Sequence, residues 1–70
     1  MSQQEVDPNE LETKGYWLRK FRLAKTMKTL ELMVPKALDT HHGNAKVEAA
    51  IYLAECQRER ELETGVLLNR

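Results

Sequence analysis

The feature that most constrains the fold is an apolar pattern at helical spacing between Lys14 and Val34. Residues three or four positions apart lie on the same side of a helix, so such a pattern predicts amphipathic helices. Two apolar sets are present, Leu11, Trp17, Leu18, Phe21 and Ala24 in the first and Leu23, Met27, Leu30 and Val34 in the second. Because the two sets differ in angle, we expect a break near Lys25 and Thr26, with Thr26 capping a second helix.

Turn-forming residues after the second set predict where that helix ends. Pro35 has no amide hydrogen and its ring clashes with the preceding turn, so the helix should stop or kink at Val34. Residues 36–38 could add one further turn. The next segment, residues 39–44, reads Asp-Thr-His-His-Gly-Asn, and it is the clearest loop in the sequence because turn formers dominate it.

A third helix should follow this loop, with Asn44 as its N-cap and Gly65 as the residue that ends it. Four apolar residues share one side of it at helical spacing, namely Val47, Ala50, Ile51 and Ala54. In residues 57–64 only Leu62 is apolar. This half should therefore project into solvent or lie against a charged surface, helped by a pair between Arg58 and Glu61.

The length of the chain limits it to one small domain. A chain of 70 residues buries only a modest fraction of its apolar surface. We expect an all-α fold over residues 10–70, a small bundle of three helices or of four short ones, and a mobile tail at residues 1–9. The thin core also predicts a homodimer or a partner-stabilised monomer, and the apolar residues 66–68 suit such a contact.

Composition and motifs argue against several classes of function. The single cysteine permits no internal disulfide, the N-terminal segment is polar and acidic, and no apolar run approaches the roughly 20 residues of a membrane span, so we expect a cytoplasmic protein without membrane contact. His41 and His42 lack further metal ligands at defined spacing, and we expect both to be solvated. Cys56 lacks an activating partner, which favours a packed thiol. We expect no enzyme, metal or cofactor.

The charges are segregated along the chain although they sum to zero, with 11 Lys and Arg against 11 Asp and Glu. This balance argues against nucleic-acid binding by bulk attraction alone. Between Glu12 and Glu31 all charged residues are cations. The predicted partner-binding residues are a basic face of Arg19, Lys20, Arg22, Lys25 and Lys28, and a region of the third helix with Glu55, Arg58 and Glu61.

Aromatic residues are interleaved with these cations. Tyr16, Trp17 and Phe21 alternate with basic residues, a mixture that single-stranded nucleic-acid sites use for stacking and phosphate contact. In so small a domain, however, the only Trp and the only Phe are needed for the core, with the cations on the opposite side. We favour this second interpretation.

Three short motifs, at residues 17–22, 26–31 and 52–62, together resemble the Hha/YmoA family of small, all-helical, bacterial nucleoid-associated modulators of gene expression. Residues 17–22, Trp-Leu-Arg-Lys-Phe-Arg, resemble the family's Tyr-Leu-x-(Arg/Lys)-(Leu/Phe)-Arg element. Residues 26–31, Thr-Met-Lys-Thr-Leu-Glu, are similar to its Thr/Ser, aliphatic, any residue, Thr/Ser, Leu-Glu element. Residues 52–62, Tyr-Leu-Ala-Glu-Cys-Gln-Arg-Glu-Arg-Glu-Leu, resemble Tyr-x-Ala-Ala-Asp-His-Arg-x-x-Glu-Leu, and the whole match covers residues 16–65.

This resemblance implies a protein that attaches to the oligomerisation domain of an H-NS-type protein and adjusts silencing without reading DNA sequence itself. The family's Asp-His pair, tied to partner binding, stands here as Cys56 and Gln57, and its terminal Val-Trp helix is absent. Either Glu55 supplies the carboxylate or the chain binds something else. The leading hypothesis is a helical regulator that binds a nucleoid or transcription protein and touches DNA indirectly or weakly. The alternatives are a directly nucleic-acid-binding dimer and a toxin-type or phage-type protein adaptor.

Overall fold

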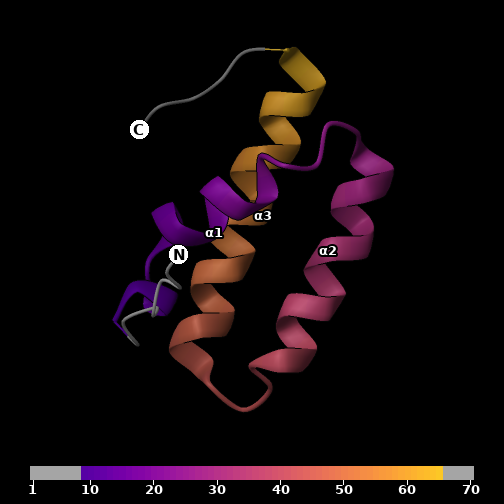
Figure 1. The fold of residues 1–70 in the computed structure, drawn as a ribbon. Coiled ribbons are helices and arrows are strands. Elements are labelled where there is room, and N and C mark those ends of the chain that lie inside the picture. Colours follow the sequence, from indigo (N-terminus) through magenta and orange to yellow (C-terminus); the bar gives the residue numbers. More distant parts are fainter. Residues whose placement is uncertain (1–8, 66–70) are drawn as a thin grey trace, which may run out of the picture.

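A computed structural model describes residues 9–65 of the chain, and its regular structure there is entirely helical (Figure 1). A short 3-10 helix, η1 (Glu10–Glu12), precedes α1 (Lys14–Phe21), α2 (Met27–Thr40) and α3 (Ala45–Thr64). The prediction of a small all-α bundle is confirmed. Residues 1–8 of the predicted tail and the apolar residues 66–68 lie outside the described residues.

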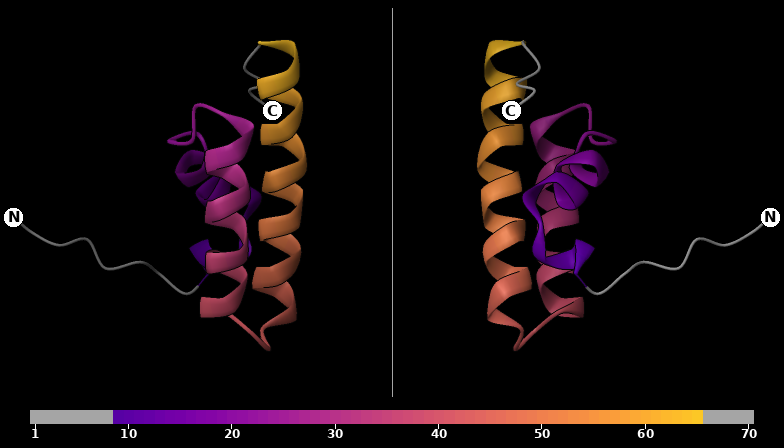
Figure 2. Two further views of the ribbon diagram at one scale, coloured as in Figure 1. Left: turned by 90° about the vertical axis from the view of Figure 1, so that its right-hand side faces the viewer. Right: turned by 90° about the vertical axis from the view of Figure 1, so that its left-hand side faces the viewer.

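Helices α2 and α3 form an antiparallel hairpin, and α1 with η1 lies against one side of it (Figure 2). The packing of α1 is mainly on α3, while its contact with α2 is smaller. The 3-10 helix also rests on α3. Helix α1 therefore packs closely on α3, and a pocket lies on its α2 side.

Each α-helix begins where a polar side chain accepts a hydrogen bond from an exposed backbone amide. Thr26 accepts from the amide of Thr29, and Asn44 accepts from the amide of Val47, so both predicted caps are confirmed. The cap of α1 is Thr13, which sequence reasoning did not single out. Gly65 ends α3 with a left-handed φ of 76°, as predicted, because glycine adopts this conformation without a steric cost.

Helix α2 continues through Pro35 to Thr40, so it does not stop at Val34, which was the first of the two outcomes that we expected there. Pro35 lies on the exposed side of the helix. Its ring therefore removes a backbone hydrogen bond only where water can replace it. The helix continues because Ala37 and Leu38 pack against the core beyond the proline.

The core is formed by one apolar side of each α-helix and one residue of the turn after α1. It contains Trp17, Leu18, Phe21, Ala24, Leu30, Val34, Val47, Ala50, Ile51 and Ala54. The predicted apolar side of α3 is confirmed. Leu23, which we placed in the second apolar set, is 73% exposed, because α1 ends at Phe21 and Leu23 lies in the turn.

The outward side of α3 carries apolar residues that the core does not use. Tyr52 and Leu53 are more than half exposed, and Cys56 is exposed as well. The prediction of a packed thiol is therefore wrong, because α3 is turned so that Ala54 and Arg58 face inward. None of the helices within residues 9–65 combines the length and the apolar character that a membrane span requires.

Candidate functional site

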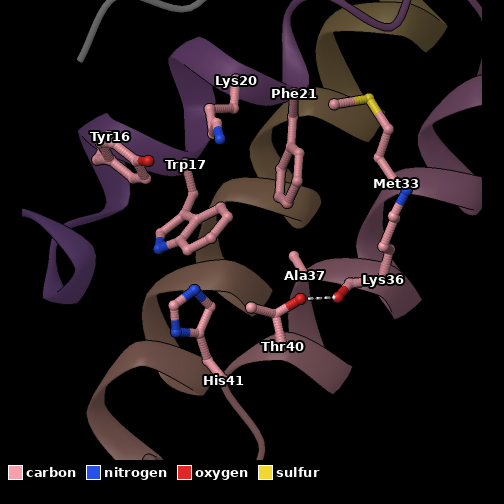
Figure 3. A pocket seen from close by; sticks show the side chains of 9 residues that line it. All are labelled: Tyr16, Trp17, Lys20, Phe21, Met33, Lys36, Ala37, Thr40 and His41. Carbon is pink, nitrogen blue, oxygen red and sulfur yellow. Dashed lines mark hydrogen bonds between the residues drawn. The ribbon is translucent and has the colours of Figure 1, made fainter. Parts of the chain in front are cut away.

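An open pocket of about 410 Å³ lies between α1 and the second half of α2 (Figure 3). Its lining consists of Tyr16, Trp17, Lys20 and Phe21 from α1, Met33, Lys36, Ala37 and Thr40 from α2, and His41 directly after α2. Ligand pockets in proteins commonly have volumes of about 300–1,000 Å³. This pocket therefore has room for one large side chain or a small ligand.

The two walls follow from helical spacing. On α1, Tyr16 lies one turn from Lys20, and Trp17 lies one turn from Phe21, so these pairs share a side of the helix. On α2 the four lining residues, Met33, Lys36, Ala37 and Thr40, recur at intervals of three, one and three positions. Such spacing places them on one side of a continuous helix. The second wall thus exists because α2 does not end at Pro35.

Trp17 is the centre of the aromatic wall and is held from several directions. The rings of Tyr16 and His41 meet it edge-on at centroid distances of 5.0 and 5.4 Å, and the Phe21 ring is tilted against it at 5.9 Å. The indole N–H donates a hydrogen bond of 2.8 Å to the carbonyl of Leu11 in η1. These contacts fix the orientation of the indole and leave the residue 4% exposed.

Two lysines give the pocket a positive charge from opposite walls. The Lys20 Nζ lies 5.5 Å from the centroid of the Tyr16 ring and 5.8 Å from that of Trp17, distances at which the ring faces attract a cation. Figure 3 shows the Lys20 amine directed toward these two rings. Lys36 lines the α2 wall and is exposed. Among the described residues that line the pocket, none is acidic.

The five cations of the predicted basic face do not all lie at the surface. Arg19, Lys20, Lys25 and Lys28 are exposed, whereas Arg22 turns toward α3 and bonds to Glu61. Of the five predicted cations only Lys20 lines the pocket. The second pocket lysine, Lys36, was not among the predicted site residues.

Arg22, Arg58 and Glu61 form what we name the charged cluster. The Glu61 side chain is fully buried, and 7% of the Arg58 side chain and 27% of the Arg22 side chain are exposed. Arg22 Nε donates to Glu61 Oε1 at 3.1 Å, and its Nη2 donates to Oε2. Arg58 Nη1 donates to Glu61 Oε1 at 2.9 Å. Each oxygen of the carboxylate therefore accepts a charge-assisted hydrogen bond.

The charged cluster joins the turn after α1 to the second half of α3. Arg58 Nη2 donates to the backbone carbonyl of Ala24 at 2.8 Å, across 34 positions of sequence. The hydrogen bond to Glu61 raises the pKa of Arg22, and although burial acts in the opposite direction, Arg22 stays charged. Arg58 Nε is buried without a hydrogen-bond partner among the described residues. The cluster thus serves packing between elements.

The placement of the predicted residues on α3 bears on their role. Arg58 and Glu61 are buried and bonded within the chain, so neither presents a surface to a partner in this conformation. Glu55 is partly buried, and its pKa is raised, first by burial and then by the charge and hydrogen bond of Glu59. Residues 57–64 accordingly lie in part against a charged surface, the second of the two arrangements that we expected.

The two histidines differ in their exposure to solvent. His42 is exposed, as predicted, but His41 packs on Trp17 and lines the pocket, so the prediction that both are solvated is wrong for His41. Within residues 9–65 no three His, Cys, Asp or Glu side chains come together in a way that could hold a metal ion.

The α2 wall is the part of the site that sequence reasoning missed. Its signal was the helical spacing of Met33, Ala37 and Thr40, which runs on past Pro35 and pairs with the aromatic side of α1. Comparison of the chain with family models, with curated proteins and with solved structures gives no match.

Proposed function

We propose that this protein is a small helical binding module that docks a protein partner at the pocket between α1 and α2, and that it regulates the partner through this contact. The observation that carries the proposal is the pocket itself, in which an immobilised aromatic wall faces a helix across an open space with lysines on both sides. A wall that is ordered before binding loses little conformational entropy when a partner docks. Apolar walls with a few charged groups are typical of such sites.

The more specific form of the proposal names an H-NS-type nucleoid or transcription protein as the partner and gene expression as the regulated process. It rests on the resemblance of residues 16–65 to the Hha/YmoA family. The pocket supports the relevance of the first motif, because Trp17, Lys20 and Phe21 lie both in that motif and in the pocket lining. In this form DNA is contacted only indirectly or weakly.

The alternative function is direct binding of nucleic acid by the exposed cations. Arg19, Lys25 and Lys28 are exposed and suit phosphate contacts. However, Trp17 is 4% exposed and Phe21 is 1% exposed, so neither offers the open ring face on which a base stacks. The geometry therefore favours a protein partner.

Capture of the partner with a blocked pocket tests the proposal. Ala37→Arg places a long cationic side chain between the walls, and Ala49→Arg makes the same change on the exposed side of α3, away from the pocket. Each tagged variant is incubated with bacterial lysate, and co-purified proteins are identified by mass spectrometry. Circular dichroism confirms that each variant is helical.

We expect the wild type and Ala49→Arg to retain the same partner and Ala37→Arg to lose it. Recovery of an H-NS-type protein would support the specific form. Equal retention by Ala37→Arg would contradict docking at the pocket. If nuclease treatment removed all captured material, and mixed-sequence duplex bound tightly at moderate salt, the nucleic-acid alternative would replace the proposal.

A further inference from the structure

We propose that the pocket recognises an acidic polypeptide segment, which inserts one aromatic or large aliphatic side chain between the walls and sets the carboxylate of a flanking residue against Lys20 and Lys36. This inference rests on the proposed function and specifies the chemistry of the partner. It is carried by the combination of a pocket sized for one side chain with charge of a single sign on its two walls.

The apolar part of the pocket fits one side chain. The partly buried Tyr16, Met33 and Ala37 offer apolar surface, and the ring edges of Trp17 and Phe21 lie deeper. Ala37 contributes only a methyl group, so space remains opposite the aromatic wall. Met33 has a flexible, polarisable side chain that adapts to the shape of an inserted group. An apolar anchor residue would therefore be removed from water on several sides.

The charged part of the pocket sets the sign of the flanking residues. Lys20 extends from α1 and Lys36 from α2, so both walls of the pocket carry a positive charge. Neither lysine has an ion-pair partner within the described residues, in contrast to Arg22. A carboxylate beside the anchor would meet a flexible ammonium donor on either wall, whereas a cation there would be repelled.

A phosphate could approach the same lysines, but the rest of a nucleotide fits less well. The Trp17 ring already packs against the rings of Tyr16, Phe21 and His41, Lys20 lies over it, and the residue is 4% exposed. A base needs an open ring face to stack. A peptide side chain needs only apolar contact at its tip and sides, which this pocket supplies.

Trp17 provides the measurement, because it is the only tryptophan in the chain and it lines the pocket. Its fluorescence is followed in the full-length protein during titration with three blocked tripeptides, Asp-Phe-Asp, Lys-Phe-Lys and Asp-Ala-Asp. We expect saturable binding of Asp-Phe-Asp in the millimolar range or tighter, about tenfold stronger than binding of either other peptide. The first comparison tests the charge and the second tests the apolar anchor.

Charge reversal of the pocket sharpens the test. The double variant Lys20→Glu/Lys36→Glu should prefer Lys-Phe-Lys over Asp-Phe-Asp. The matched variant Lys46→Glu/Arg60→Glu changes the same number of charges at exposed positions of α3 and should keep the wild-type preference. Equal binding of the acidic and basic peptides by the wild type, or an unchanged preference after reversal at Lys20 and Lys36, would overturn the inference.

A single-stranded oligonucleotide is the fourth probe. If it bound more tightly than Asp-Phe-Asp and lost binding in Lys20→Glu/Lys36→Glu, the acidic segment would be replaced by nucleic acid as the ligand. If none of the peptides bound but Ala37→Arg still lost the partner, the inferred recognition of an acidic segment would be overturned and the proposed function would stand. If Asp-Phe-Asp bound as expected but Ala37→Arg captured the partner as well as the wild type does, the recognition of an acidic segment would be supported and the proposed function would be overturned.

Discussion

Lys20 and Arg22 belong to the same run of cations, yet they serve two different regions of the molecule. Lys20 lies exposed over the rings of the pocket, whereas Arg22 bonds to a fully buried carboxylate in the charged cluster. At 3.6 residues per turn, positions two apart are rotated by about 200° around the helix axis and so point to nearly opposite sides. A cationic helix can therefore present charge to solvent on one side and use it for internal packing on the other.

The two regions also differ in what removal of a charge should do. In the charged cluster the two arginines form ion pairs with Glu61 inside the protein, so loss of one partner leaves a buried charge unpaired. At the pocket the lysines are solvated, so their loss changes recognition more than stability. Three predictions test this division, in order of expected effect.

Glu61→Ala should have the largest effect on folding. It leaves Arg58 buried without a carboxylate, which costs about 3–5 kcal/mol of the free energy of unfolding. A domain of this size has a total stability of about 4–10 kcal/mol, so the substitution should remove a large share of it. Urea titration followed by circular dichroism measures the loss.

The double variant Arg58→Met/Glu61→Leu is the control for this prediction. Both buried charges are removed together, so the variant should be more stable than Glu61→Ala although it loses more hydrogen bonds. Wild-type stability in Glu61→Ala would show that the charged cluster does not hold α3 to the end of α1.

Arg22→Ala and Lys20→Ala form the matched pair that tests the comparison directly. Arg22→Ala removes hydrogen bonds to a buried carboxylate from a partly exposed side chain, and it should cost about 1 kcal/mol. Lys20→Ala should change the free energy of unfolding by less than about 0.5 kcal/mol. Thermal and urea unfolding of both variants measures the two values. Binding of Asp-Phe-Asp should show the reverse order, with a larger loss of affinity in Lys20→Ala than in Arg22→Ala. A larger loss of stability in Lys20→Ala than in Arg22→Ala would contradict the roles that we assign to the two residues.

Glu55→Gln should have the smallest effect and the opposite sign. Glu55 faces the carboxylate of Glu59 one turn away, whereas Glu61 on the same helix faces two arginines. The pKa of Glu55 is raised in the folded protein, so the folded state binds this proton more readily than the unfolded state. At neutral pH the charged Glu55 therefore lowers stability, and its removal should add about 0.2–0.5 kcal/mol.

The pH dependence of this gain follows from the same pKa. As pH falls through the raised pKa, Glu55 becomes protonated and its penalty disappears, so wild type and Glu55→Gln should converge in acid. Unfolding curves at neutral and acidic pH measure the difference, with the exposed Glu63→Gln as the control that should show no comparable gain. A gain that grew in acid would contradict this account.

Sequence reasoning succeeded where a structure is decided by neighbouring residues. The caps at Thr26 and Asn44 and the glycine at position 65 act on backbone groups a few positions away, and all three were predicted. The apolar side of α3 was also predictable, because its spacing is a property of the helix itself. These local signals were sufficient for the number of α-helices and for the fold class.

Prediction from the sequence failed where contacts across the bundle decide how far a helix runs and which side chains are buried. A proline at position 35 weakens a helix locally, but packing of Ala37 and Leu38 compensates, and the missed continuation hid the second wall of the pocket. In the same way, Arg58 and Glu61 resemble an exposed pair on a polar helix. Only the approach of Arg22 and the Ala24 carbonyl shows that they are buried.

The hydrogen bond from the indole of Trp17 to Leu11 has a practical consequence for anyone who trims the chain. The acceptor lies in η1, ahead of the first α-helix, so a version starting at Thr13 would keep all three α-helices yet remove the anchor of the indole. Such a shortened protein would retain its helical content while its tryptophan emission shifted. Purification tags and fusions are therefore better attached with Asn9 to Glu12 left intact.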